Sequence, residues 1–287
     1  AHDMAREYKV LSALAPTAVP VPRTLAFCED VAVNDAPFYV MEFVAGMVPT
    51  DAAAVAKRYD EATLRRMSEE LVDTLVLLHA LQPADVGLAD FGKPQGFIER
   101  QVRRFTGQIE QHRTRDVPEL EELARRLGAS IPPESGAAII HGDYRIDNSV
   151  IGDDGHIAAV LDWEMATLGD PLSDVGLLYM YWAASDGPVG TQGISGSVTA
   201  LPGFLKRDQA IKRYAERSGR DLDHLDFYIV LAYFKLAVIV EGIYARFLEG
   251  GTVGTGFEAT GAQAQNLART GLAVANASSV ATLRASS

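Results

Sequence analysis

Residues 141–148 read HGDYRIDN and residues 161–164 read LDWE, and these two stretches are the strongest indication of the fold in the chain. They contribute the carboxylates of Asp143 and Asp162 and the side-chain amide of Asn148. Carboxylate and amide oxygens are ligands that Mg²⁺ prefers, and the other positions around that ion usually go to water and phosphate. We therefore expect the two stretches to meet around one hard cation.

The residues between the two stretches predict how they meet. The apolar residues 137–140 predict a buried strand that ends at His141. Further along, residues 149–152 and 156–161 flank the turn sequence Asp-Asp-Gly, a pattern typical of a β-hairpin. The sequence therefore predicts a strand, a loop and then a hairpin.

The register of this hairpin predicts a metal pair. A hairpin centred on Gly155 places Asn148 directly opposite Asp162, and opposed residues have Cβ atoms about 4.5–5.5 Å apart. Asp143 lies in the loop before Asn148, where its carboxylate can reach an incoming hydroxyl from the other side of the metal. Phosphoryl transfer needs one carboxylate to orient the acceptor hydroxyl and a metal to hold the nucleotide phosphates. The pattern predicts that chemistry, with Asp143 as the base.

The motif pair resembles a known family. Asp143 followed by Asn148, with Asp162 after a hairpin, is similar to the catalytic loop and metal aspartate of the protein-kinase-like fold. With His-Gly-Asp at its start, the loop resembles the aminoglycoside phosphotransferase and choline kinase branch. The resemblance implies an α+β, two-lobed protein-kinase-like fold with a truncated N-lobe and a mostly helical C-lobe. It places the partial N-lobe at residues 1–47 and the C-lobe at 48–287.

The nucleotide side of the site also follows from this resemblance. Residues 36–46, APFYVMEFVAG, resemble the last N-lobe strand and the hinge, so backbone around Glu42 and Val44 is expected to hold the base. Glu7 falls where the family has the helix glutamate that pairs with the nucleotide lysine. The chain opens at Ala1 with no glycine-rich loop and no lysine upstream of Glu7. Either the full protein supplies them, which we favour, or part of the nucleotide-binding site is missing.

Three further residues complete the expected site. Asp174 lies in GDPLSD at residues 169–174, which matches the family segment that follows the metal aspartate, and is expected to support the catalytic loop. His141 is interpreted as a structural histidine that holds the loop. Arg145 lies where related kinases place a cation near the γ-phosphate, because negative charge develops there. A surface ion pair explains Arg145 equally well.

The acceptor remains open between two classes. Glu7-Tyr8, residues 37–39 and residues 162–171 are most similar to a sub-branch that also occurs fused to acyl-CoA dehydrogenases, whose members act on hydroxyacyl-CoA esters. The expected function is transfer of the γ-phosphoryl of ATP or GTP, with Mg²⁺, to a hydroxyl of a small molecule, as in aminoglycoside phosphotransferases. A hydroxyacyl-CoA kinase and a non-catalytic nucleotide-binding module are the alternatives.

Composition limits the class of protein. The chain has 287 residues, 22% charged and 48% hydrophobic, which is typical of a globular protein. A net charge of −12 argues against a nucleic-acid partner, because phosphate binding needs a basic face. Cys28 is the only cysteine, which excludes an internal disulfide and favours a reducing, cytoplasmic compartment. Lys235 and Glu241 interrupt the apolar residues 227–247, so we expect a buried helix rather than a membrane span.

Apolar periodicity predicts the helices. Residues 61–81 repeat leucine and methionine at three- and four-residue spacing, and residues 4–14 are also expected to be helical. We expect further helices at 96–112, 118–128, 171–184, 204–218, 223–249 and 257–277. Residues 185–200 are rich in Gly, Ser and Thr, which indicates either a lid or a plain connection. Residues 277–287 are expected to form a frayed tail.

Overall fold

The computed structural model describes residues 3–111, 113–183, 196–251 and 255–284. The chain forms two compact units. Unit 1 comprises residues 1–94, 136–174 and 181–221, and unit 2 comprises residues 95–135, 175–180 and 222–287. The α-helices are α1 (Met4–Leu14), α2 (Val31–Asn34), α3 (Ala52–Arg58), α4 (Glu61–Ala80), α5 (Phe97–Gln111), α6 (Pro118–Ala129), α7 (Leu172–Tyr181), α8 (Arg207–Ser218), α9 (Leu225–Leu248) and α10 (Thr260–Ala277). The strands are β1 (Thr24–Cys28), β2 (Phe38–Met41), β3 (Ala138–Ile140), β4 (Ser149–Ile151), β5 (Ile157–Val160) and β6 (Thr167–Gly169).

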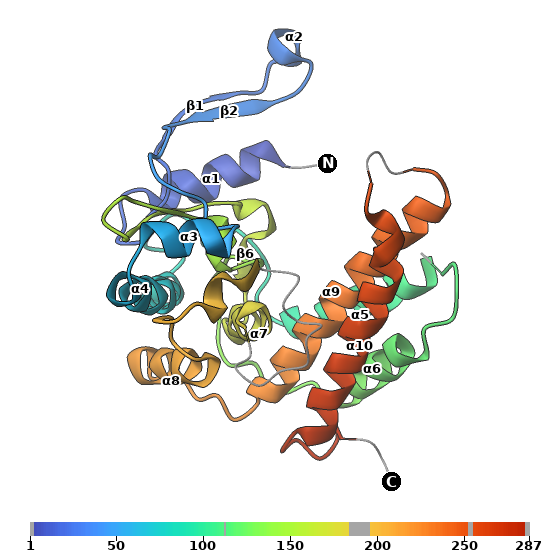
Figure 1. Ribbon diagram of the computed structural model, residues 1–287. Helices are drawn as coiled ribbons and strands as arrows, with labels where there is room; N and C mark the ends of the chain where they lie inside the picture. The colour runs from blue at the N-terminus through green and yellow to red at the C-terminus, as the bar shows by residue number, and fades with distance from the viewer. Residues whose placement is uncertain (1–2, 112, 184–195, 252–254, 285–287) are drawn as a thin grey trace. The chain divides into compact units, whose positions relative to one another are not determined.

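The N-terminal part of unit 1 is a helix packed on a hairpin. Asp3 caps α1, since its carboxylate accepts the Arg6 backbone N–H at 3.1 Å. β1 and β2 pair antiparallel, and α2 forms the tip of their hairpin (Figure 1). Tyr8 of α1 stacks on Phe27 of β1 with ring centroids 5.2 Å apart. This stacking fixes α1 against the hairpin that leads to the expected hinge.

The predicted amphipathic helix α4 forms the centre of unit 1. Asp60 caps it by accepting the Thr63 N–H at 2.8 Å, and the helix ends at Ala80. Its predicted apolar face is buried: Leu64, Met67, Leu71, Leu75 and Leu78 are each at most 3% exposed. α4 packs on β3, which pairs with β6. The strand that leads into the catalytic loop is therefore anchored on a packed helix.

The predicted hairpin is present, but its predicted register is wrong. β4 and β5 pair Ser149 with Val160, and the Leu161 N–H donates to the Asn148 carbonyl at 2.8 Å. Asn148 therefore lies opposite Leu161 rather than Asp162. The cause is a three-residue turn in which Gly155 is left-handed, with φ of 80°, followed by a bulge. Asp162 comes directly after the paired residues.

Unit 2 is built from helices. α9 packs against α10, α6 and α5, and Figure 1 shows α10 alongside α9. By length and composition α9 is apolar enough to cross a membrane, with a mean hydropathy of 1.7, but 72% of that window is buried. Its buried Glu241 accepts two hydrogen bonds from Arg115, at 2.8 and 2.6 Å. The expected buried helix is confirmed.

The predicted helices agree with the structure to within three residues at each end. α7 ends at Tyr181 rather than at residue 184. The tail is ordered as far as Arg284, which corrects the expected fraying, because Leu283 is fully buried and its carbonyl accepts from Arg126. Of the predicted loop 185–200, residues 185–195 lie outside the described residues, and a 3-10 helix covers Gly196–Ala200. The lobe boundary near residue 47 stays a prediction.

Candidate active site

The catalytic loop turns sharply where it leaves β3. Gly142 has φ of 85°, a conformation that residues with a side chain rarely adopt. A Cβ at this position would lie only 2.8 Å from the Met165 carbonyl oxygen. The glycine of His-Gly-Asp is therefore required both by the turn and by the close approach of the segment after Asp162.

His141 is a structural residue in this loop. It is fully buried, its Nε2 lies 2.9 Å from the Leu161 carbonyl, and its Nδ1 accepts the Asp143 N–H at 3.2 Å. These two partners assign a neutral imidazole with its proton on Nε2. Burial lowers the pKa of His141, which keeps it neutral. The ring ties the catalytic loop to the residue that precedes Asp162, as expected for structural support.

Asp174 lies beneath the loop and holds its backbone. One carboxylate oxygen accepts the His141 N–H at 2.7 Å, and the other accepts the Gly142 N–H at 2.8 Å. His79 Nε2 lies 3.3 Å from the same carboxylate. Burial alone raises the pKa of Asp174, but the hydrogen bonds from the His79 side chain and the His141 backbone outweigh it and lower that pKa. Asp174 thus binds two backbone N–H groups at the start of the loop.

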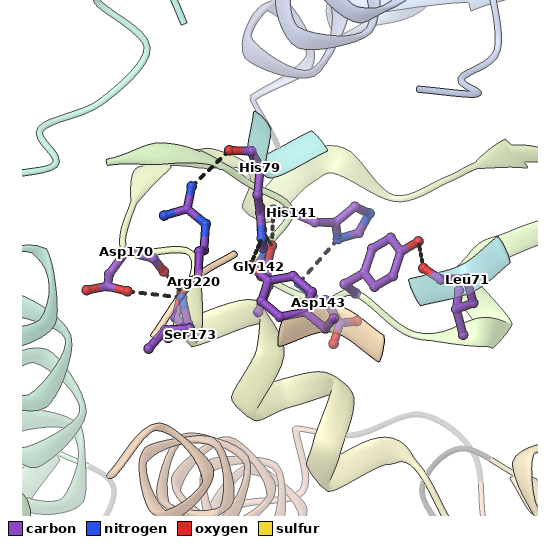
Figure 2. Close-up of polar contacts among 12 residues, drawn as sticks. Leu71, His79, His141, Gly142, Asp143, Asp170, Ser173 and Arg220 are labelled. Carbon is purple, nitrogen blue, oxygen red and sulfur yellow. Dashed lines mark hydrogen bonds and ion pairs between the residues drawn. The ribbon is translucent and has the colours of Figure 1, made fainter. Parts of the chain in front are cut away.

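Asp174 is itself positioned from two directions. Asp170 caps α7 by accepting the Leu172 N–H at 3.0 Å, as its place in Gly-Asp-Pro predicts. From α8, the Tyr214 hydroxyl lies 2.8 Å from His79 Nδ1. Figure 2 shows Arg220 reaching the His79 carbonyl, at 3.0 Å. Sequence reasoning did not find these partners of His79, because they lie far along the chain.

Asp143 is held through both of its carboxylate oxygens. The Asn148 side-chain amide donates to Oδ2 at 3.1 Å, and Arg145 Nε lies 3.4 Å from the same oxygen. The Tyr181 hydroxyl donates to Oδ1 at 2.9 Å. The loop and the end of α7 therefore fix one carboxylate, and Tyr181 was not among the predicted site residues.

Arg145 lies inside this cluster. Its Nη1 is 2.9 Å from the Asp147 carboxylate, and its guanidinium stacks over the Tyr181 ring, 5.1 Å from the centroid. Burial raises the pKa of Asp147, while the Arg145 charge partly opposes that shift. The ion pairs of Arg145 are therefore made within the loop, next to the predicted base.

Asn148 and Asp162 offer the expected donor set for a metal. The Asn148 amide nitrogen donates to Asp143 at both carbonyl and carboxylate, so its amide oxygen is directed away from Asp143. Asp162 is left-handed, with φ of 63°, which is uncommon for a residue with a side chain. Partial burial, with the nearby charges of Glu164 and Asp143, raises its pKa. A cation would relieve this repulsion, so the residues fit Mg²⁺.

No larger metal cluster is present in the described part of the chain, where no group of three or more His, Cys, Asp or Glu side chains converges. Mg²⁺ at a nucleotide usually needs one or two protein ligands, with phosphate oxygens and water as the others. Asn148 and Asp162 are enough for that arrangement.

Glu7 has two partners that were not predicted from the sequence. It makes a hydrogen bond with the Tyr39 side chain and one with the Trp163 backbone. Burial raises the pKa of Glu7, and burial together with the Glu7 charge raises the pKa of Tyr39 to about 12. Arg6 adds a second tie, because its guanidinium donates to the Ala166 carbonyl at 3.2 Å. α1 is thus linked to the segment that follows Asp162, at Trp163 and Ala166.

The expected hinge follows β2. The Glu42 carboxylate accepts the Arg23 N–H at 2.9 Å, and the Glu42 N–H donates to the Arg23 carbonyl at 2.9 Å. The side chain of Glu42 is therefore committed to the strand connection rather than directed at a ligand. Val44 is half-buried, and within the described residues its N–H donates no hydrogen bond.

The model of the phosphotransferase enzyme family matches residues 1–219. The chain belongs to that family, which confirms the predicted class. Acyl-CoA dehydrogenase family member 11 from Gallus gallus is 34% identical over 259 residues, which are 87% of this chain and 32% of that protein. The chain thus spans about a third of the length of this relative, and the likeness confirms the predicted sub-branch.

Solved structures agree with the fold. A Ralstonia eutropha protein, whose assignment as an aminoglycoside phosphotransferase is provisional, has a TM-score of 0.84 and 33% identity. That likeness covers 94% of this chain and 82% of the other. An aminoglycoside phosphotransferase from Streptomyces rimosus, in complex with ADP and streptomycin, has a TM-score of 0.52 and 22% identity, with coverage of 80% and 81%. The predicted α+β, protein-kinase-like fold is confirmed.

Proposed function

We propose that the protein is a small-molecule kinase that transfers the γ-phosphoryl of ATP or GTP to a substrate hydroxyl with Mg²⁺, in the manner of aminoglycoside phosphotransferases. One observation carries the proposal. The Asp143 carboxylate is fixed by Asn148, Arg145 and Tyr181, and its charge helps to raise the pKa of Asp162. A base and a metal carboxylate thus lie at the open end of one hairpin, Asp143 before its first strand and Asp162 after its second.

The proposed mechanism depends on position rather than covalent chemistry. Asp143 accepts a hydrogen bond from the acceptor hydroxyl, orients its oxygen toward the γ-phosphorus and takes its proton. Arg145, beside Asp143, contributes positive charge where the transferred group carries negative charge. Asn148 and Asp162 would hold Mg²⁺, which supplies charge neutralisation on the nucleotide phosphates when it is bound.

The nucleotide base would be held by backbone near Glu42 and Val44. The half-buried Val44 N–H supports this role, because within the described residues it is not used in a hydrogen bond. Glu7 makes hydrogen bonds with the Tyr39 side chain and the Trp163 backbone. It would pair with a nucleotide lysine if the full protein supplies one.

A second acceptor is favoured by one comparison. The relative from Gallus gallus is named for an acyl-CoA dehydrogenase family. A hydroxyacyl-CoA ester is therefore the alternative acceptor to an aminoglycoside or amino alcohol. The two differ in charge: a CoA ester carries phosphates, whereas an aminoglycoside carries several amines, which suit a chain of net charge −12.

A thermal-shift assay with ATP and GTP, each with and without Mg²⁺, tests the proposal. Ligand at 100 times its dissociation constant adds about 2.7 kcal/mol, which at this size raises the midpoint by about 5–10 °C. A Mg²⁺-dependent rise with one nucleotide supports the kinase, and transfer of labelled phosphate to each acceptor class then identifies the substrate. No rise with either nucleotide would instead indicate a non-catalytic module.

A further inference from the structure

Tyr181 contacts Asp143, the predicted base, from a different element than the other partners of Asp143. Asn148 and Arg145 belong to the catalytic loop and both approach Asp143 Oδ2. Tyr181 is the last residue of α7, and its hydroxyl donates to Oδ1 at 2.9 Å. The two oxygens of Asp143 are therefore held separately, one by the loop and one by the helix.

This contact uses only part of the hydrogen-bonding capacity of Asp143. A carboxylate oxygen has two lone pairs, and the Tyr181 hydroxyl uses one of those on Oδ1. A second hydroxyl can bind the same oxygen beside the phenol without displacing it. The helix contact therefore orients the carboxylate and still leaves a lone pair for the substrate.

The ring of Tyr181 makes a second contact. The Arg145 guanidinium stacks 5.1 Å from the ring centroid, within the range of a cation–π interaction. One side chain thus supports both charged groups of the catalytic loop, Asp143 through the hydroxyl and Arg145 through the ring. A phenylalanine would keep the second contact and lose the first.

Tyr181 is suited to act as a permanent donor. Burial, together with the negative charge of Asp143, raises the pKa of its phenol well above the usual range. The hydroxyl therefore stays protonated and does not compete with Asp143 for the acceptor's proton.

We propose that Tyr181 is a positioning residue for phosphoryl transfer: its hydroxyl fixes Oδ1 of Asp143 and its ring supports Arg145, so that the acceptor hydroxyl binds Asp143 beside the phenol. This inference rests on the proposed function. It adds a residue from α7 to a site whose other members follow from the loop motif.

Steady-state kinetics of Tyr181→Phe and Tyr181→Leu test the role. A hydrogen bond to a charged group is worth a factor of about 10–100, so Tyr181→Phe should lower kcat by about that factor and leave the nucleotide KM within about twofold. Tyr181→Leu should lower kcat further, because Arg145 also loses the ring. Tyr59→Phe is the matched control, since that hydroxyl donates to the Gly152 carbonyl in the hairpin turn at 2.9 Å. Its kcat should not change.

A double-mutant cycle on unfolding separates this inference from the proposed function. Tyr181→Phe should change the unfolding constant in the wild-type background and much less in Asp143→Ala, with a coupling of about tenfold. A wild-type protein that phosphorylates no acceptor would remove the proposed function and leave this coupling unchanged. Additive effects in the cycle, or a Tyr181→Phe kcat equal to wild type, would overturn the role of Tyr181.

Discussion

Asp174 and Asp162 both lie against the catalytic loop, yet their surroundings shift their pKa values in opposite directions. Asp174 is fully buried and accepts the N–H groups of His141 and Gly142, and its pKa is lowered. Asp162 is partly exposed and lies near Asp143, and its pKa is raised. We call the first set, Asp174 with His79 and His141, the anchor region. Asp143, Asn148 and Asp162 form the reaction region.

The difference between the two regions separates stability from chemistry. In the anchor region every charge is matched by donors, so the region stabilises the loop without any ligand. In the reaction region two carboxylates oppose each other and Asp162 has a left-handed backbone. Strain and repulsion of this kind persist at functional sites because the rest of the structure holds them in place. A cation bound between Asp143 and Asp162 would replace this repulsion by attraction of both carboxylates to the cation.

The largest expected effect lies in the reaction region and separates the roles of its two carboxylates. Asp143→Ala should lower kcat by about 10²–10⁴-fold, the usual range for a positioned acid or base, and leave nucleotide binding largely intact. Asp162→Ala should instead abolish the Mg²⁺-dependent nucleotide shift. Phosphate-transfer kinetics and thermal shift on the same preparations measure both quantities. Full turnover by the Asp143 variant would show that another group orients the acceptor.

The second prediction separates the regions by stability. Asp174 accepts two backbone N–H groups, whereas the asparagine of Asp174→Asn has one acceptor oxygen and one donor NH2 group. The substitution should therefore cost about 3 kcal/mol of unfolding free energy. The same substitution at Asp162 is the control, and should leave the ligand-free protein as stable as wild type or slightly more stable. Urea denaturation measures both. Equal losses at the two positions would contradict the distinction between anchor and reaction regions.

Acidification should reveal that the pKa values of Asp174 and Asp162 are shifted in opposite directions. The pKa of Asp174 is lower in the folded protein, so its stabilisation is present above about pH 3.9 and is lost as the pH falls through the folded value. The pKa of Asp162 is raised on folding, so its ionisation costs stability at neutral pH; that cost falls as the pH drops below the raised pKa and is gone below about pH 3.9. The difference between wild type and Asp162→Asn should therefore shrink from pH 7 to pH 4. The difference for Asp174→Asn should persist over that range.

Sequence reasoning succeeded where the signal is local. Apolar periodicity gave α4, and the Gly-Asp-Pro signal gave the start of α7 near Asp170. The loop motif identified Asp143 and Asn148, which the structure brings into contact. In these cases neighbours along the chain determine the outcome, so spacing is enough.

Sequence reasoning failed where the outcome depends on packing between distant residues. The hairpin register was wrong because the turn is centred on Asp154 rather than on Gly155, and the bulge that follows restores only one of the two residues of offset. Tyr181 was missed because it is the last residue of an apolar helix and meets Asp143 only after α7 packs. The tail was expected to fray, yet Leu283 is buried by contacts with residues far upstream.

The smallest expected effect asks to which region Glu7 belongs. Burial raises its pKa, so its charge costs stability at neutral pH, as in the reaction region. Glu7→Gln should therefore leave the thermal midpoint of the nucleotide-free protein unchanged or about 1–2 °C higher, since a glutamine oxygen still accepts from Tyr39. Tyr39→Phe is the paired variant and should lower the midpoint by a similar amount, because it removes a donor from a half-buried charge. If Glu7→Gln lowered the midpoint as far as Asp174→Asn, Glu7 would instead be an anchor, and α1 would be held to the Trp163 backbone by a satisfied charge rather than kept ready for a cation.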